Sequence, residues 1–140
     1  MRRIVLDTNV VVSGMRSREG ASYRLLLELG GNPRFRIFVS VPLAMEYEMA
    51  LKRTPGLRST DAEGMVDFLC EVGEKREIYF LWRPFLRDPK DEMVLEVAVE
   101  AQADAIVTHN VRDFKGVEDR FGIRIVTPGA FLLELEGEAK

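Results

Sequence analysis

The sequence is poor in the two side chains that most often hold zinc. It has one cysteine, Cys70, and one histidine, His109. A lone cysteine cannot form an internal disulfide, and the scarcity of both types argues against a zinc site. No apolar run approaches the roughly 20 residues that a membrane-spanning helix needs. Only Ile4, Val5 and Leu6 separate Arg3 from Asp7, too few for a signal peptide. We therefore expect a cytoplasmic protein with no membrane partner.

The sequence also lacks a dominant charge. The net charge of −3 makes no case for nucleic-acid binding by itself. With 46% hydrophobic and 31% charged residues, the composition is that of an ordinary globular protein. A chain of 140 residues can bury a substantial core, and no repeat or linker interrupts it. We expect a single domain over residues 1–140.

Short apolar runs alternate with segments of helical periodicity along the chain. The segment 13–22 has the composition of a turn. Ser40 and Asp88 are placed to cap helices, and Thr60 with Glu63 forms a capping-box pattern. The predicted strands are residues 3–6, 35–40, 76–82, 103–110 and 123–128. The predicted helices are residues 23–29, 41–53, 60–72, 89–101 and 129–136. This alternation predicts a parallel sheet covered by helices on both faces.

Polar residues follow strands that otherwise look fully buried. Asp7, Thr8 and Asn9 end the first strand, and Asn110 ends the run "IVTHN". Ligands of open parallel sheets bind beyond the carboxyl ends of the strands, so these side chains are expected at one edge. Glu46, one to two turns into a helix, and Asp91, in the first turn of another, can reach the same edge. Three carboxylates there would repel one another, and Mg²⁺ or Mn²⁺ would relieve the repulsion.

Four segments together resemble the PIN-domain ribonucleases. They are "IVLDTNVVVSG", "SVPLAMEYEMAL", "DPKDEMVLEVAVEAQADAIVTHNVRDF" and "FGIRIVTPGAFL", which span about residues 2–133. The likeness is greatest to the VapC-like branch, the toxin components of toxin–antitoxin systems. The resemblance implies a three-layer α/β/α sandwich with a central, mainly parallel sheet. It also implies a Mg²⁺- or Mn²⁺-dependent acidic site that hydrolyses RNA phosphodiester bonds.

The family's site carries over residue by residue. Asp7 matches the acid after the first strand, Glu46 the acid of the second matching segment, and Asp91 the acid that opens the next helix. Many members have an aspartate where this chain has Asn110, so the fourth position is assigned jointly to Asn110 and Asp113. The resemblance makes Asp7, Asp91 and Glu46 the expected metal ligands. Three neighbouring side chains are expected to orient carboxylates and water: Thr8, Asn9 and Thr108.

Each acidic residue also has a purely structural interpretation. Asp7 could cap the turn that follows it. Asp91 stands at the third position of a helix, where an acid interacts favourably with the helix dipole. Glu48 competes with Glu46 from two residues away, although Glu46 fits the family spacing better.

RNA contacts are expected from loop cations: Arg16, Arg18, Arg53, Arg112 and Lys115. No aromatic stacking platform is apparent beside them. The resemblance further implies a cognate antitoxin, which would insert a cation into the acidic site, and a homodimer or higher homo-oligomer.

Two other functions stay open. One is a catalytically inactive PIN-like module that binds RNA or protein, which Asn110 makes conceivable. The other is a phosphohydrolase of the haloacid-dehalogenase kind, which fits poorly because Asn9 stands where that family needs an aspartate.

Overall fold

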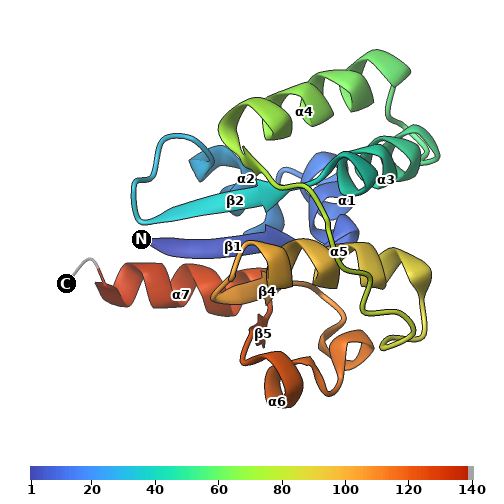
Figure 1. Cartoon of the computed structure of the whole chain (residues 1–140). Coiled ribbons are helices and arrows are strands. Elements are labelled where there is room, and N and C mark those ends of the chain that lie inside the picture. The colour runs from blue at the N-terminus through green and yellow to red at the C-terminus, as the bar shows by residue number, and fades with distance from the viewer. Residues whose placement is uncertain (139–140) are drawn as a thin grey trace.

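The computed structural model describes residues 1–138, which form a sheet of five parallel strands between layers of helices (Figure 1). The strands are β1 (Arg2–Leu6), β2 (Phe35–Val39), β3 (Glu74–Lys75), β4 (Ala105–Val107) and β5 (Arg124–Val126). Their order across the sheet is β3-β2-β1-β4-β5. The helices are α1 (Thr8–Arg16), α2 (Ala21–Glu28), α3 (Val41–Lys52), α4 (Ser59–Val72), α5 (Pro89–Glu100), α6 (Val117–Phe121) and α7 (Pro128–Glu138), with a 3₁₀ helix η1 (Val111–Phe114). The predicted α/β/α sandwich is confirmed.

The central strand β1 is buried because helices cover both of its faces. Its residues Ile4, Val5 and Leu6 are at most 1% exposed. Helix α5 packs against β1, β2 and β4, and α4 packs against β2, whereas α2 packs against α1 and α7. Figure 1 shows α5 in front of the sheet, with α1 and α2 behind it. Such a strand needs apolar side chains in both directions, which explains its continuous β-branched run.

The register brings the carboxyl ends of β1 and β4 together. Leu6 pairs with Val107, and the Asp7 amide donates to the Val107 carbonyl at 2.9 Å. Beyond these two strands the chain turns into α1 and into η1 respectively. Asp7 and the residues after Val107 are therefore neighbours, as the parallel arrangement predicts.

Helix α1 was not predicted from the sequence. Asp7 is its N-cap, and its carboxylate accepts a hydrogen bond from the Thr8 amide. Val10 and Val11 are fully buried. Their contact with the core stabilises a helix whose β-branched residues and Gly14 have low helix propensity. The prediction of a turn over residues 13–22 is therefore wrong for 13–16, and also for 21–22, which begin α2.

The predicted strand over residues 76–82 is also wrong. In this part of the chain the pairing with β2 is limited to Glu74 and Lys75 of β3, and one further ladder bond runs from the Arg76 amide to the Val39 carbonyl at 2.8 Å. Residues 77–88 form a loop without helix or strand, which we call the strap. Its Tyr79 and Phe80 are 72% and 68% exposed. The β-branched and aromatic composition that suggested a strand belongs here to an exposed loop.

Smaller differences concern helix boundaries. Helix α4 begins at Ser59, one residue earlier than expected, and Asp61 rather than Glu63 accepts the capping bond from the Arg58 amide. Helix α6 and the 3₁₀ helix were not expected. In the described part of the chain, no helix is long and apolar enough to cross a bilayer.

Candidate active site

Asp7 is buried and fully hydrogen-bonded. One of its oxygens accepts from the Thr8 amide at 2.8 Å and the other from the Thr108 hydroxyl at 2.7 Å. Burial raises the pKa of the Asp7 carboxyl, and the charges of Asp113 and Asp88 raise it further, whereas the two hydrogen bonds lower it. The side chain is therefore held in one orientation while its ionised form is disfavoured.

The Thr108 hydroxyl fixes this orientation. Its oxygen accepts hydrogen bonds from the Asn110 amide at 3.0 Å and the Asn9 side-chain amide at 3.4 Å. A hydroxyl has a single proton, so with both acceptor positions in use that proton points to Asp7. The structure thus brings Asn9 and Thr108 to Asp7, as the sequence predicts. Thr8 lies beside them, with a buried hydroxyl that has no hydrogen-bond partner among the described residues.

Asp91 differs from Asp7 because no hydrogen bond or ion pair holds its carboxylate in the described part of the chain. It stands in the first turn of α5, which Asp88 caps by accepting from the Lys90 amide at 2.9 Å. Its pKa is raised to about 7, first by desolvation and then by the charges of Asp7, Asp88 and Asp113. The predicted position in the first turn of the helix is confirmed, and the carboxylate is left available for a ligand.

Of the two candidates for the fourth position, only Asp113 carries a charge that acts on the other acidic residues. It lies in η1 and raises the pKa of both Asp7 and Asp91. Asn110 caps the same 3₁₀ helix, and its backbone amide binds Thr108. Of the two residues predicted jointly, Asp113 therefore adds charge near the other acidic residues, whereas Asn110 is neutral and binds Thr108 through its backbone amide.

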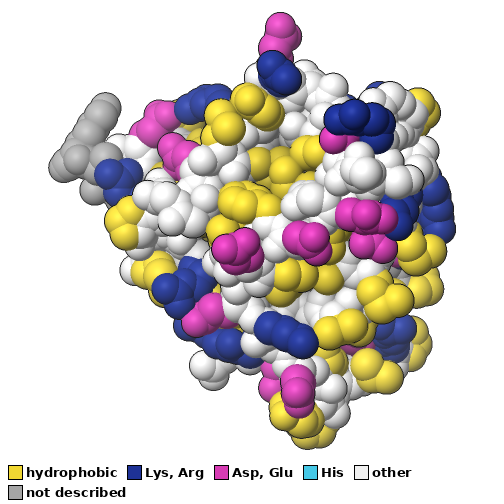
Figure 2. All heavy atoms as spheres, turned by 90° about the horizontal axis from the view of Figure 1, so that it is seen from above, with side chains coloured by type: hydrophobic (Ala, Val, Ile, Leu, Met, Phe, Trp, Pro, Cys, Tyr) yellow, Lys and Arg dark blue, Asp and Glu magenta, His cyan; other side chains and the backbone are white. Residues whose placement is uncertain are grey.

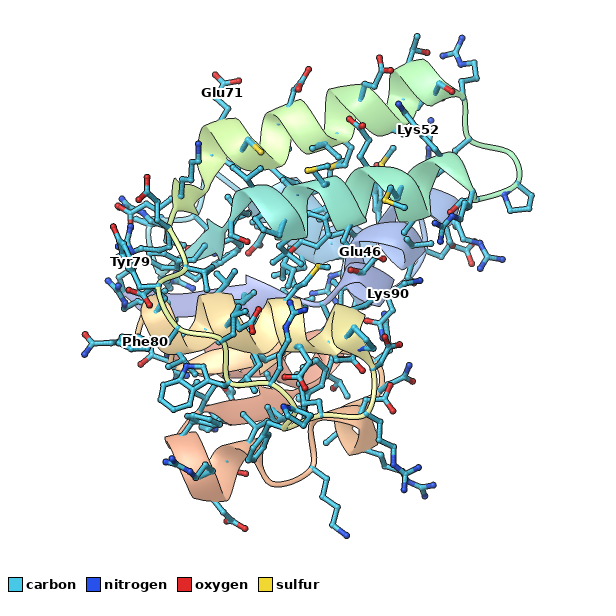
Figure 3. The ribbon with its side chains drawn as sticks, turned by 45° about the vertical axis from the view of Figure 1, so that its right-hand side comes forward. Glu46, Lys52, Glu71, Tyr79, Phe80 and Lys90 are labelled. Carbon is cyan, nitrogen blue, oxygen red and sulfur yellow. The ribbon has the colours of Figure 1, made fainter. Side chains whose placement is uncertain are left out.

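Glu46, in α3, is only 6% exposed and meets the first turn of α5 through Lys90. Its carboxylate lies 3.9 Å from the Lys90 ammonium, and Figure 3 shows the two side chains next to each other, from α3 and α5. The neighbouring Tyr47 donates its hydroxyl proton to the Leu6 carbonyl at 2.5 Å, which ties α3 to the residue before Asp7. Lys90 was missed in the sequence, although its position next to Asp91 in a first helical turn was a usable signal.

A cleft of about 740 Å³ extends from the acids. Among the predicted RNA-contacting residues, Arg112 and Lys115 line it together with Asp91 and Asp113. Phe85 and Arg87 line the same cleft, and neither was predicted. One aromatic side chain, that of Phe85, therefore lies among these cations.

The other predicted cations lie elsewhere. Arg16 is the last residue of α1, at the end remote from Asp7, and Arg53 follows the last residue of α3. Arg18 is exposed in the loop after α1. In the described part of the chain, no hydrogen bond or ion pair connects these three side chains with the acidic residues.

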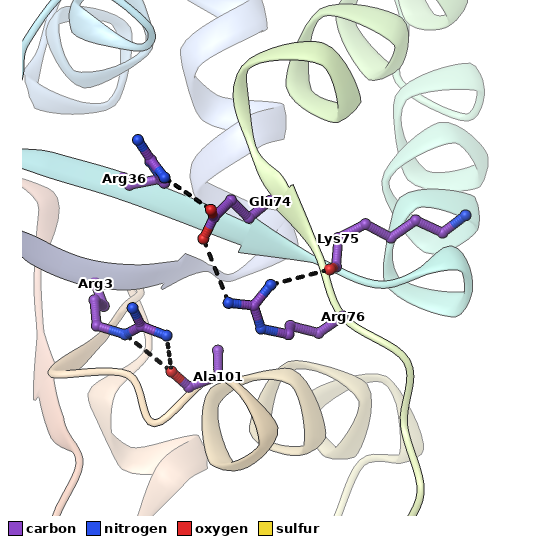
Figure 4. A network of polar contacts seen from close by, with 6 residues as sticks. All are labelled: Arg3, Arg36, Glu74, Lys75, Arg76 and Ala101. Atoms are coloured by element: carbon purple, nitrogen blue, oxygen red, sulfur yellow. Dashed lines mark hydrogen bonds and ion pairs between the residues drawn. The ribbon is translucent and has the colours of Figure 1, made fainter.

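Several charged side chains along β1, β2 and β3 are paired. Glu74 binds Arg36 at 2.7 Å and Arg76 at 3.4 Å, and both Nε and Nη2 of Arg3 donate to the Ala101 carbonyl (Figure 4). The guanidinium groups of Arg3 and Arg76 also lie over the Phe38 ring, 4.5 and 4.8 Å from its centroid. These side chains have partners, whereas the carboxylates of Asp91 and Asp113 have none among the described residues.

The acidic side chains in the described part of the chain do not form a complete cation site in this conformation. Among the residues that the structure describes, no three acidic, histidine or cysteine side chains stand close enough together to hold one. The donor chemistry nevertheless suits a hard divalent cation, since Asp91 and Asp113 offer unpaired carboxylates and the Thr8 hydroxyl is unpartnered. The catalytic and metal-binding roles of these residues stay predictions.

Fold and site together define an α/β/α protein with a carboxylate cluster at the carboxyl edge of its sheet. The family model described as "PIN domain" matches residues 3–112, and the chain belongs to this family. No curated protein sequence gives a significant match.

Two solved structures show the same fold. One is VapBC2 from Rickettsia felis bound to a DNA fragment from its promoter, with 15% identity and a TM-score of 0.58. The match covers 89% of this chain and 96% of the other. The second is VapBC-1 from nontypeable Haemophilus influenzae, with 18% identity and a TM-score of 0.63, covering 91% and 98% of the two chains.

Proposed function

We propose that the protein is a Mg²⁺- or Mn²⁺-dependent endoribonuclease and the toxin of a toxin–antitoxin pair, acting on cellular RNA in the cytoplasm. The observation that carries the proposal is the set of uncompensated carboxylates of Asp91 and Asp113 beside the oriented carboxylate of Asp7. Membership of the PIN-domain family supports it. Such acids cost stability when ionised, a cost that is typical of sites arranged for a ligand.

The residues fit a divalent cation in their chemistry. Asp7 and Asp91, with Asp113 or Glu46, would hold it by rotation of the unpaired side chains, and the Thr8 hydroxyl could bind a coordinated water. When bound, the cation supplies Lewis acidity to the scissile phosphate and lowers the pKa of a water molecule.

The protein's own side chains then have separate tasks. Thr108 keeps the Asp7 carboxylate in one rotamer, so the site needs little reorganisation there. In this proposal Glu46 would accept a proton from the attacking water, and Lys90 beside it would bind a phosphate oxygen. Because water rather than the ribose 2′-hydroxyl attacks, the products carry 5′-phosphate and 3′-hydroxyl ends.

An antitoxin partner and a homodimer or higher homo-oligomer belong to the same proposal. Both structural neighbours are VapBC assemblies, which supports a cognate partner protein for this chain. Helix α3 exposes the apolar side chains of Val41, Met45 and Met49. Figure 2 shows hydrophobic side chains gathered between charged ones on the face that includes α4.

The test is cleavage of total cellular RNA with Mn²⁺ or Mg²⁺, mapped by sequencing the new 5′-phosphate ends. We expect discrete ends with the wild type that disappear with Asp7→Asn and with a chelator. Asp113→Asn should slow cleavage more than Asn110→Ala, because only Asp113 carries a charge that reaches Asp7 and Asp91. Ends that survive Asp7→Asn would refute the proposed site, and a folded wild type that cleaves nothing would favour a binding module.

A further inference from the structure

One hydrogen bond links α2 to the residues from Thr108 to Asn110, which we call the orienting segment. Oγ of Ser22, in the first turn of α2, lies 2.7 Å from Nε2 of His109. Helix α2 lies behind the sheet and packs against α1 (Figure 1). In the described part of the chain, no other hydrogen bond or ion pair connects α2 with the orienting segment. Loss of this bond would leave the two without a polar connection.

The burial of the serine determines which group donates the proton in this bond. Ser22 is only 4% exposed, whereas His109 is exposed. The Ser22 hydroxyl has no second partner among the described residues. If it only accepted a bond from the ring, its own proton would be buried without an acceptor, which is unfavourable. The Ser22 hydroxyl therefore donates and Nε2 accepts, which places the proton of the neutral imidazole on Nδ1.

Further hydrogen bonds connect His109 with the carboxylate of Asp7. The His109 amide donates to the Asn9 side-chain oxygen at 3.3 Å, and the Asn9 side-chain amide donates to the Thr108 hydroxyl at 3.4 Å. The Thr108 hydroxyl in turn donates to Asp7 at 2.7 Å. A continuous series of hydrogen-bonded residues therefore runs from Ser22 in α2 to the carboxylate of Asp7.

We infer that Ser22 and His109 are positioning residues, which hold the orienting segment so that the Asp7 carboxylate is ready to bind a divalent cation. This inference rests on the proposed function and adds two residues to its site. Without their bond the charges of the site remain, but the cation must order the carboxylate as it binds. Loss of a group that orients a metal ligand typically lowers metal affinity or activity by about 10- to 100-fold. Because Ser22 and His109 act through Thr108, we expect the lower end of that range.

The first measurement is the nitrogen NMR spectrum of the imidazole, which requires neither metal nor RNA. His109 is the only histidine of the chain, so protein without an affinity tag gives one pair of ring-nitrogen signals. The wild type should show a protonated Nδ1 and an unprotonated Nε2. Ser22→Ala should give the spectrum of an imidazole exposed to water. A wild type that already gives that spectrum would overturn the inference, because the bond would be absent in solution.

The second measurement is the affinity for Mn²⁺ alone, together with kcat and KM for RNA cleavage at limiting Mn²⁺. Ser22→Ala and His109→Leu should each lower the Mn²⁺ affinity and kcat roughly tenfold, with KM for RNA nearly unchanged. His109→Gln should restore most of both, because its side-chain oxygen can accept the Ser22 proton in place of Nε2. The double variant Ser22→Ala with His109→Leu should be no worse than either single variant, since both remove the same bond.

The matched control is Thr54→Val, which removes another buried hydroxyl. Thr54 is 8% exposed and donates to the Ala50 carbonyl at 2.8 Å. Its replacement should lower the melting temperature about as much as Ser22→Ala does. It should change neither the Mn²⁺ affinity nor kcat.

The inference is overturned if the wild type binds Mn²⁺ and cleaves RNA but Ser22→Ala and His109→Leu do both equally well. The bond would then serve only the stability of the fold, and the proposed function would stand. A wild type that has the expected imidazole spectrum but neither binds Mn²⁺ nor cleaves RNA would refute the proposed function itself, and the role in cation binding with it.

Discussion

Two charged regions along the sheet differ in how their side chains are paired. Beside β1, β2 and β3, Glu74 is shared by Arg36 and Arg76, and the Arg3 guanidinium is held by a carbonyl. At the carboxyl end, Asp91 and Asp113 have no such partner among the described residues. Paired charges stabilise the fold modestly, whereas unpaired carboxylates lower its stability. The difference indicates that the unpaired carboxylates, which lower the stability of the fold, lie where a ligand is proposed to bind.

The largest effect is expected from removing an unpaired acid. Asp91→Asn should reduce RNA cleavage at least about a hundredfold, because the lost charge stabilises the transition state by several kcal/mol. The matched control is Asp61→Asn, since Asp61 also stands in a first helical turn but is paired with Arg58. Single-turnover cleavage rates measure both variants. Equal rates for Asp91→Asn and the wild type would place the site elsewhere.

Removing one partner of a buried ion pair should lower the stability of the protein rather than its activity. Arg83 makes two hydrogen bonds to Glu96, whose side chain is 3% exposed. Arg83→Ala leaves that buried carboxylate unpaired and should lower the free energy of unfolding by about 3 kcal/mol in urea denaturation.

The double variant Arg83→Met with Glu96→Leu tests the cause of that loss. Replacing both charges by apolar side chains should recover most of the stability, because a buried ion pair itself adds little. A double variant as unstable as Arg83→Ala would show that the strap needs the ion pair itself.

The unpaired Asp91 should also make stability depend on pH in the absence of divalent cations. Its folded-state pKa of about 7 lies above the ordinary value of 3.8, so the unfolded chain releases this proton first as the pH rises. Stability is therefore lost between about pH 4 and 7. Asp91→Asn should stabilise the protein by about 1–2 kcal/mol at pH 8, a value reduced by solvent screening of this half-exposed group, and by almost nothing at pH 3.

Thermal unfolding at both pH values in a chelating buffer measures this effect. A stabilisation of equal size at pH 3 and pH 8 would mean that charge is not its cause. Excess Mn²⁺ should raise the melting temperature of the wild type and not that of the variant, because a ligand stabilises only the protein that binds it.

The smallest effect is expected at an exposed pair. Arg24 and Glu136 are 3.1 Å apart, with side chains 60% and 58% exposed. Arg24→Ala should change the free energy of unfolding by less than about 0.5 kcal/mol. A loss above 1 kcal/mol in urea denaturation would erase the distinction between this pair and the Arg83–Glu96 pair.

The sequence predicts the sheet better than the strap. The run Ile4–Leu6 and its counterpart Ala105–Val107 are buried on both faces, and local composition reports that burial directly. Residues 76–82 have an equally strong strand composition. They leave the sheet because Glu92 binds the amides of Phe85 and Leu86, and Glu96 binds Arg83. Those contacts join residues whose pairing no local pattern reveals.

The site shows the same division. The neighbouring positions of Asp7 and Asp91 could be predicted because one follows a strand and the other opens a helix, and topology brings such positions together. Asp113 was proposed, jointly with Asn110, only from the resemblance to the family. The contact of Lys90 with Glu46 could not, because it depends on how α5 lies against α3. Phe85 was missed because a single aromatic residue in an apolar run gives no sign that it faces a cleft.

The hydrogen bond from Tyr47 to the Leu6 carbonyl has a mechanical consequence. It joins the second turn of α3 to the end of β1. A shift of α3, whose outer surface exposes Met45 and Met49, would therefore either break this bond or displace the residue that precedes Asp7. A molecule bound to the outer surface of α3 would therefore act on the position of Asp7 without contacting the acidic residues.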